Sequence, residues 1–160
     1  MKYIFSLLVF IIGCSSTQMH ITPIDPPFDP PPTSDAAAES GIKWVAPSPE
    51  LEEQAVSENK TIILYIKQNG CPSCINMENN LFQEDCVVNA ITKNYIPVKL
   101  NLSEEPDVIT EEILNMGIDS TPTIMFIMPW GDIFPLILVG NTTSDGFCQL
   151  LDDLTELSND

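Results

Sequence analysis

Two cysteines three residues apart, Cys71 and Cys74, have the type and spacing that thiol–disulfide chemistry requires. They follow an apolar run, 61–66, and precede a segment, 75–82, that can form a helix. At such a junction Cys71 lies at the helix N-terminus, where unpaired N–H groups and the helix dipole favour an anion. A thiolate there has a lowered pKa and attacks disulfides. Cys74, one turn later, is placed to resolve the mixed disulfide.

Pro72 and Ser73 separate the two thiols. Proline suits the first helical turn because the N–H that it lacks would be unpaired there anyway. The alternative is a structural pair of cysteines, either buried or forming half of a zinc site. Zinc needs about four ligands, whereas the sequence has no second Cys-x-x-Cys and its single histidine, His20, lies far upstream. We therefore expect redox chemistry at this motif, with no metal and no organic cofactor.

The start of the chain predicts an export signal. Met1-Lys2 is a short basic region, and the apolar run 3–12 is too short to span a bilayer but suits a signal-peptide core. The following Ile11-Ile12-Gly13-Cys14 resembles the bacterial lipoprotein signal. That resemblance implies cleavage after residue 13 and lipidation of Cys14; an uncleaved short apolar helix is the alternative. More than one acyl chain on the cysteine would anchor the protein stably.

The next segment, 14–42, is predicted to be a tether. It contains five prolines between Ile24 and Ser34, and such a composition favours extended polyproline conformation. Ser15, rather than an acidic residue, follows the lipidated cysteine. In enterobacterial lipoproteins this favours the outer membrane, so we expect a lipid-anchored protein of a bacterial envelope, on the periplasmic side. Residues 43–160 remain for one domain with one core.

The formal net charge of −17, with no arginine, restricts the partners. Phosphate backbones would be repelled, so nucleic-acid binding is not expected. Anionic membrane surfaces would not attract the domain either, which leaves membrane attachment to the lipid on Cys14.

The pattern of the remaining chain predicts the order helix, strand, helix, strand, helix, strand, strand, helix. The strands are expected at 61–67, 96–102, 123–128 and 133–139, and the last two form a hairpin across Trp130-Gly131-Asp132. The first strand is β-branched and apolar throughout, which is typical of a central strand. Strands that alternate with helices and end in a hairpin imply a mixed sheet with helices on both faces.

With these elements in place, the chain resembles the thioredoxin-fold family, and in particular the thioredoxin-like domain of bacterial thiol–disulfide interchange proteins. The supporting residues are Cys71-Pro72-Ser73-Cys74, Met77-Glu78, Leu81-Phe82, 95–101, Gly117-Ile118 and Ser120-Thr121-Pro122-Thr123. The resemblance covers about 44–157. It implies an α/β thioredoxin-like fold with a central mixed sheet of four to five strands and helices on both faces.

The resemblance also implies roles for residues distant from the motif. Pro122 would follow a cis peptide bond beside the thiols, and Thr121 would pair with a bound substrate strand. An ordinary trans proline at the start of an edge strand is the alternative. Gly70 stands where the family usually has tryptophan, and Tyr65 stands where thioredoxins carry a buried aspartate that moves the proton of the resolving thiol.

Glu78 matches an acidic position of the interchange-type relatives and is a candidate for the missing proton acceptor. A solvated glutamate on the helix surface is the alternative. Cys86 and Cys148 are the two cysteines that remain after Cys14, Cys71 and Cys74 are assigned, so they could pair with each other. They are either a structural disulfide, since the family places their two helices on one face of the sheet, or two buried small apolar residues.

The sequence thus predicts an envelope-anchored thiol–disulfide oxidoreductase, with a reductase or interchange role favoured. Its partners would be protein disulfides or dithiols and an envelope redox protein. The alternative from another class is a non-catalytic binding or assembly lipoprotein on the same fold, with structural cysteines. A copper or zinc handler is a third possibility with less support, because no histidine or methionine ligand set flanks the motif.

Overall fold

The computed structural model describes residues 40–139 and 142–159. Its elements, in chain order, are α1 (Glu50–Glu58), β1 (Thr61–Lys67), α2 (Pro72–Asn79), the 3-10 turn η1 (Leu81–Gln83), α3 (Asp85–Asn94), β2 (Tyr95–Asn101), α4 (Asp107–Asn115), β3 (Thr123–Ile127), β4 (Ile133–Val139) and α5 (Ser144–Asn159). The strands occur in the predicted order, with ends within a residue of those expected. Between β1 and β2 the structure has two helices, α2 and α3, joined by η1, where the predicted order has one. Within the described ranges, the helices lack the length and apolar character needed to cross a bilayer.

The strands form one mixed sheet in the order β2-β1-β3-β4. β1 pairs in parallel with β2 and antiparallel with β3, and β3 pairs antiparallel with β4. The prediction of a central first strand is therefore confirmed. An isolated bridge between Val45 and Val98 extends the edge of β2 without adding a full strand.

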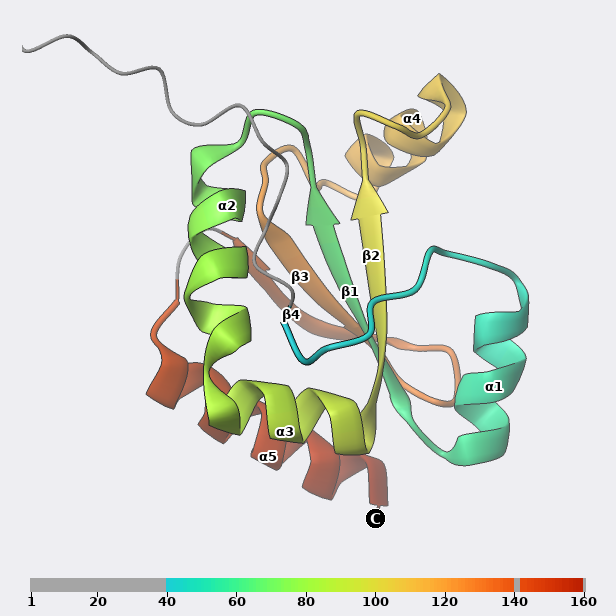
Figure 1. The fold of residues 1–160 in the computed structure, drawn as a ribbon. Coiled ribbons are helices and arrows are strands. Elements are labelled where there is room, and N and C mark those ends of the chain that lie inside the picture. The colour runs from blue at the N-terminus through green and yellow to red at the C-terminus, as the bar shows by residue number, and fades with distance from the viewer. Residues whose placement is uncertain (1–39, 140–141, 160) are drawn as a thin grey trace, which may run out of the picture. The chain divides into compact units, whose positions relative to one another are not determined.

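Helices cover both faces of the sheet (Figure 1). Because successive strand residues point to opposite faces, Ile63 and Tyr65 of β1 pack in one cluster with buried side chains of α2, α3 and α5. Ile62 and Ile66 lie on the other face, in clusters with residues of α1 and α4 respectively. Every residue of β1 except Leu64 is buried, since both faces of this strand are covered.

The folded segment begins before the predicted boundary at residue 43. Ile42 is 4% exposed and belongs to the main core cluster. Two residues later, Trp44 packs against Tyr65 and Phe82 with ring centroids 5.6 and 5.0 Å apart. The end of the tether is therefore part of the core, because it supplies apolar side chains to the face covered by α2.

The elements around the motif end where their sequence requires. β1 leads through Gly70, in the left-handed region at φ +70°, into α2, whose first residue is Pro72. α4 ends at Gly117, at φ +81°, a conformation that glycine adopts without steric cost. Ile118 follows and is buried against α4, so the chain turns directly toward β3.

Candidate active site

Cys71 caps the N-terminus of α2. Its backbone is extended, at φ −90° and ψ 104°, and its Sγ accepts a hydrogen bond from the backbone N–H of Cys74 at 3.1 Å. The same N–H also donates to the Cys71 carbonyl at 3.1 Å, and the sulfur lies at the positive end of the helix dipole. The arrangement stabilises a thiolate at Cys71 once the cysteine is reduced.

Cys71 and Cys74 are joined by a disulfide, with Cα atoms 5.2 Å apart. Cys71 is 6% exposed, whereas Cys74 has no exposed surface. Pro72 is exposed and Ser73 partly exposed, so the loop over the bond is open to solvent on their side. Both cysteines are largely buried, and only Cys71 keeps any exposed surface, which fits attack at Cys71 and resolution by Cys74.

The loop before β3 lies against this sulfur. The Thr121–Pro122 peptide bond is cis, as the resemblance implied. The Thr121 hydroxyl donates to Cys71 Sγ at 3.5 Å, and the Thr123 hydroxyl holds the loop by donating to the Ser120 carbonyl at 2.6 Å. Antiparallel pairing of β3 with β1 brings these residues, about fifty positions downstream, next to the motif.

Glu78 is buried beneath the motif, at 4% exposure, so it is not a solvated glutamate on the helix surface. Both of its carboxylate oxygens accept from Lys67 Nζ at 3.1 Å, and Oε1 also accepts from Lys99 Nζ at 3.2 Å. Glu78 lies four residues after Cys74 on α2, and residues at this spacing share a helix face. The site therefore holds a buried carboxylate between two ammonium groups, one turn from the resolving cysteine.

Tyr65 occupies the strand position where the family carries an aspartate. Its hydroxyl donates to the Cys74 carbonyl at 3.4 Å, and its side chain is fully buried. Burial, with a smaller contribution from the Glu78 carboxylate, raises the pKa of Tyr65 far above its usual value. Tyr65 is thus neutral and structural here. The carboxylate on the motif helix is that of Glu78.

The sequence did not single out Lys67. Strand alternation contained the signal, because Ile63, Tyr65 and Lys67 share one face of β1, and that face packs on α2. A lysine at the end of a strand is usually solvated, whereas this one is 8% exposed and paired with Glu78. The alternation of side chains along β1 therefore predicts Lys67 beside the motif helix.

Cys86 and Cys148 are joined in a second disulfide between α3 and α5. Of the two alternatives that the sequence left open, the structure has the bridged one. The bond links residues 62 positions apart, and the two helices that it joins also pack through Val87, Ile91 and Leu151. It lies outside the Cys71–Cys74 motif and is a structural disulfide between the two helices.

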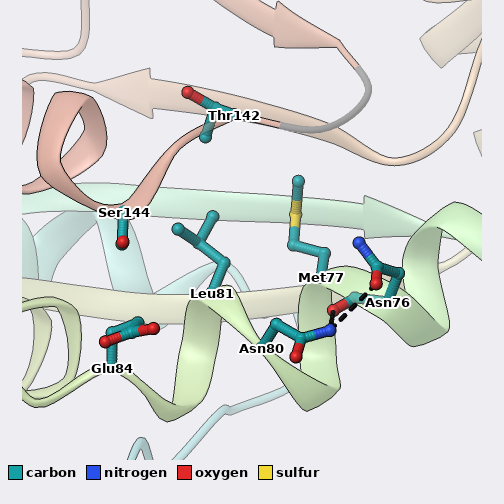
Figure 2. A pocket seen from close by; sticks show the side chains of 7 residues that line it. All are labelled: Asn76, Met77, Asn80, Leu81, Glu84, Thr142 and Ser144. Atoms are coloured by element: carbon teal, nitrogen blue, oxygen red, sulfur yellow. Dashed lines mark hydrogen bonds between the residues drawn. The ribbon is translucent and has the colours of Figure 1, made fainter.

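A separate hollow of about 200 Å³ lies between α2 and the start of α5 (Figure 2). Met77 and Leu81 point into it toward Thr142, and Asn80 donates to the Asn76 carbonyl and to its side-chain oxygen, both at 2.9 Å. The lining residues include neither Cys71 nor Cys74, so this hollow is not the redox site.

The lipidation site cannot be compared with the structure. Cys14, with the lipoprotein signal, lies outside the described residues. Among residues 40–139 and 142–159, no three histidine, cysteine or carboxylate side chains come together in a way that could hold a metal ion.

Comparison with known proteins identifies the family. The model of the thioredoxin-like domain matches residues 49–155, and the chain belongs to this family. A Thermus thermophilus thioredoxin superposes with a TM-score of 0.60 at 20% identity, covering 71% of this chain and 87% of that one. The DsbH oxidoreductase gives 0.61 at 16%, covering 78% and 91%. The oxidised C-terminal domain of Neisseria meningitidis DsbD gives 0.57 at 16%, covering 69% and 98%.

The curated relatives that match are much longer proteins than this chain. An uncharacterized Caenorhabditis elegans protein, B0495.5, is 25% identical over 103 residues, which are 62% of this chain and 14% of that protein. The matched segment is thus a small part of that relative. The chain has the thioredoxin-like fold, which it shares with the DsbH oxidoreductase, and it carries a bonded Cys-x-x-Cys pair at the N-terminus of α2.

Proposed function

We propose that this protein is a thiol–disulfide oxidoreductase in which Cys71 exchanges with partner disulfides and Cys74 resolves the intermediate. The observation that carries the proposal is the position of Cys71 Sγ, which caps α2 and also contacts the Thr121 hydroxyl beside a cis proline. Donors around one accessible sulfur suit a thiolate nucleophile.

In the reducing direction the reaction has two steps. The Cys71 thiolate attacks one sulfur of a partner disulfide, forms a mixed disulfide and releases the other partner sulfur as a thiolate. Cys74 then loses its proton and attacks Cys71 Sγ, which expels the second partner thiolate and leaves the Cys71–Cys74 bond described here. The partner gains two electrons, and an envelope dithiol must return two electrons to the pair.

Glu78 is the proposed acceptor of the Cys74 proton, and Pro72, Ser73, Thr121 and Pro122 form the proposed contact surface for the partner. Burial and the position one turn after Cys74 support the role of Glu78. Its two lysine partners hold the carboxylate in place. The cis-proline loop supports strand-like docking because it adjoins the attacked sulfur.

Reduction of insulin disulfides by the full chain, with dithiothreitol as electron source, tests this function. We expect turnover well above the background of dithiothreitol alone, and none with Cys71→Ser. Cys74→Ser should instead accumulate a mixed disulfide, because the resolving step is lost. Background rates for the unaltered protein, with no adduct on Cys74→Ser, would support the alternative of a binding or assembly module with structural cysteines.

We also propose that lipid on Cys14 anchors the domain in a bacterial envelope, on the periplasmic side of the outer membrane. The support is the sequence Ile11-Ile12-Gly13-Cys14 and the proline-rich segment that follows it. In a bacterial host that processes lipoproteins, the protein should fractionate with the outer membrane, and Cys14→Ser should release it from that fraction. Equal membrane association of both proteins would contradict lipid anchoring.

A further inference from the structure

A groove of about 240 Å³ adjoins the redox disulfide on the α4 side. Thr121 lines its end, and the hydroxyl of Thr121 is 3.5 Å from Cys71 Sγ. Its other lining residues come mostly from α4, from the loop that follows β2 and from the segment between α4 and β3. A segment of a partner protein that fills it would therefore place its neighbouring sulfur at Cys71.

The groove offers an apolar surface next to hydroxyl groups. Leu102, Ile118 and Leu114 supply the apolar part, and Leu114 is 51% exposed although it is a large aliphatic side chain. Ser103, Ser120 and Thr110 supply hydroxyls. This combination suits an aliphatic side chain of a partner segment, whose backbone the hydroxyls can bond.

The charge around the groove has one sign. Residues 102–121, which provide most of its lining, contain six acidic residues and no lysine or arginine. Asp119 lines the groove itself and is exposed. The two lysines nearest the motif, Lys67 and Lys99, are bound to Glu78 on the α2 face of the sheet. The loop 68–73 carries no charge, so nothing in it offsets the negative potential on the α4 side.

We infer that the groove selects disulfides in segments that carry an aliphatic residue beside the cysteine and lysine or arginine beyond it, and that it disfavours anionic disulfides. This inference rests on the proposed function, since it assigns a substrate class to the same site. The driving force is charge complementarity, which raises association rates for partners of opposite sign and suppresses those of like sign.

Two peptides, each with one disulfide, test the inference. They share a cysteine with a neighbouring leucine and differ only in three flanking residues, lysine in one and glutamate in the other. The measurement is the rate at which each oxidises the reduced full chain, at about 20 mM and about 300 mM salt. We expect the lysine peptide to react about tenfold faster at low salt, and the difference to shrink to about threefold or less at high salt because exposed charges are screened.

Variants locate the effect. Asp119→Asn combined with Asp107→Asn should narrow the low-salt preference several-fold, because both carboxylates belong to the segment 102–121 that provides most of the lining. Glu52→Gln combined with Glu53→Gln is the matched control on α1, which precedes the opposite end of β1, and should leave the preference unchanged. Equal rates for the two peptides at low salt would overturn the inference while leaving the proposed function intact. Failure of both peptides to react would overturn the proposed function, and the inference with it.

Discussion

At the scale of single residues, the site differs from the thioredoxin pattern by relocating a carboxylate. Tyr65 replaces the buried strand aspartate, and Glu78 supplies a carboxylate from α2, buried between Lys67 and Lys99. A carboxylate without partners would be costly to bury. Lys67 and Lys99 supply those partners, at 3.1 and 3.2 Å from the carboxylate oxygens.

Glu78→Gln tests the role proposed for this carboxylate. If Glu78 accepts the Cys74 proton, the variant should lose about tenfold or more in the rate of resolution, because positioned acid–base groups contribute at least that much. The measurement is the exchange rate with a peptide disulfide from pH 6 to 9. Unchanged rates and an unchanged pH profile over this range would remove Glu78 from the mechanism.

Lys67→Met tests the energetic cost of the cluster. Removing one partner of a buried ion pair costs about 3 kcal/mol or more, and Glu78 would keep only Lys99. The matched control is Lys60→Met, since the Lys60–Glu58 pair is exposed and such pairs contribute about 1 kcal/mol or less. Urea unfolding of the oxidised proteins measures both, and equal losses of stability would contradict the structural importance given to Lys67.

At the scale of elements, α5 is attached covalently to α3 and by side-chain contacts to the sheet. The Cys86–Cys148 bond joins α5 to α3, and the Tyr95 hydroxyl at the start of β2 donates to the Leu151 carbonyl. Phe147 and Leu154 are buried on the same face of the helix. The final helix is therefore fixed independently of the redox motif.

Removing the Cys86–Cys148 disulfide should lower the free energy of unfolding without affecting thiol–disulfide exchange at Cys71 and Cys74. A bond closing a loop of 62 residues is worth about 4 kcal/mol in the chain-entropy model. We expect Cys86→Ala with Cys148→Ala to lose about that amount in urea unfolding and to retain full exchange activity. Cys71→Ala with Cys74→Ala, a separation of 3, should lose less than about half as much and all of the activity. The reverse pattern would exchange the roles assigned to the two bonds.

The contact between β2 and α5 predicts a loss of stability at alkaline pH. Burial raises the pKa of Tyr95 to about 12, whereas an exposed tyrosine ionises near pH 10. Between these values the unfolded chain has lost the proton that the folded chain keeps, so stability falls as pH rises from about 10 to 12. Urea midpoints across this range should decline, and Tyr95→Phe should make the decline smaller but not abolish it, because burial also raises the pKa of Tyr65. A flat profile for the unaltered protein would contradict the burial of Tyr95.

The elements follow from local patterns that the sequence displays. β1 is apolar almost throughout and Gly117 ends α4, and both features can be recognised in the amino-acid sequence alone. Strand alternation places Lys67 on the α2 face, but the pairing of Lys67, Glu78 and Lys99 cannot be recognised in this way. The three residues come from β1, α2 and β2, and the register of Tyr65 opposite Lys99 brings them together rather than spacing along the chain. The burial of Ile42 could not be predicted for a related reason, since a short apolar stretch after a proline-rich tether shows no periodicity.

At the scale of the whole molecule, the redox motif and the loop before β3 lie at the end of β1 (Figure 1). The groove adjoins them, since Thr121 is part of its lining. Topology produces this arrangement. β1 is central, so α2 and the loop before β3 both adjoin it. The segment 102–121 at that end has acidic and no basic residues, which is compatible with docking of basic partner segments.

The reduction potential of the Cys71–Cys74 bond tests the central claim most directly. The full chain is equilibrated with glutathione or dithiothreitol buffers, and alkylation of free thiols with mass spectrometry reports each cysteine pair separately. An exchange-active pair should titrate between about −270 and −120 mV, and a reductase near the lower value. The Cys86–Cys148 bond serves as an internal reference, expected below about −300 mV as for structural disulfides. A Cys71–Cys74 potential below about −300 mV would contradict the account and mark the motif as a structural bridge.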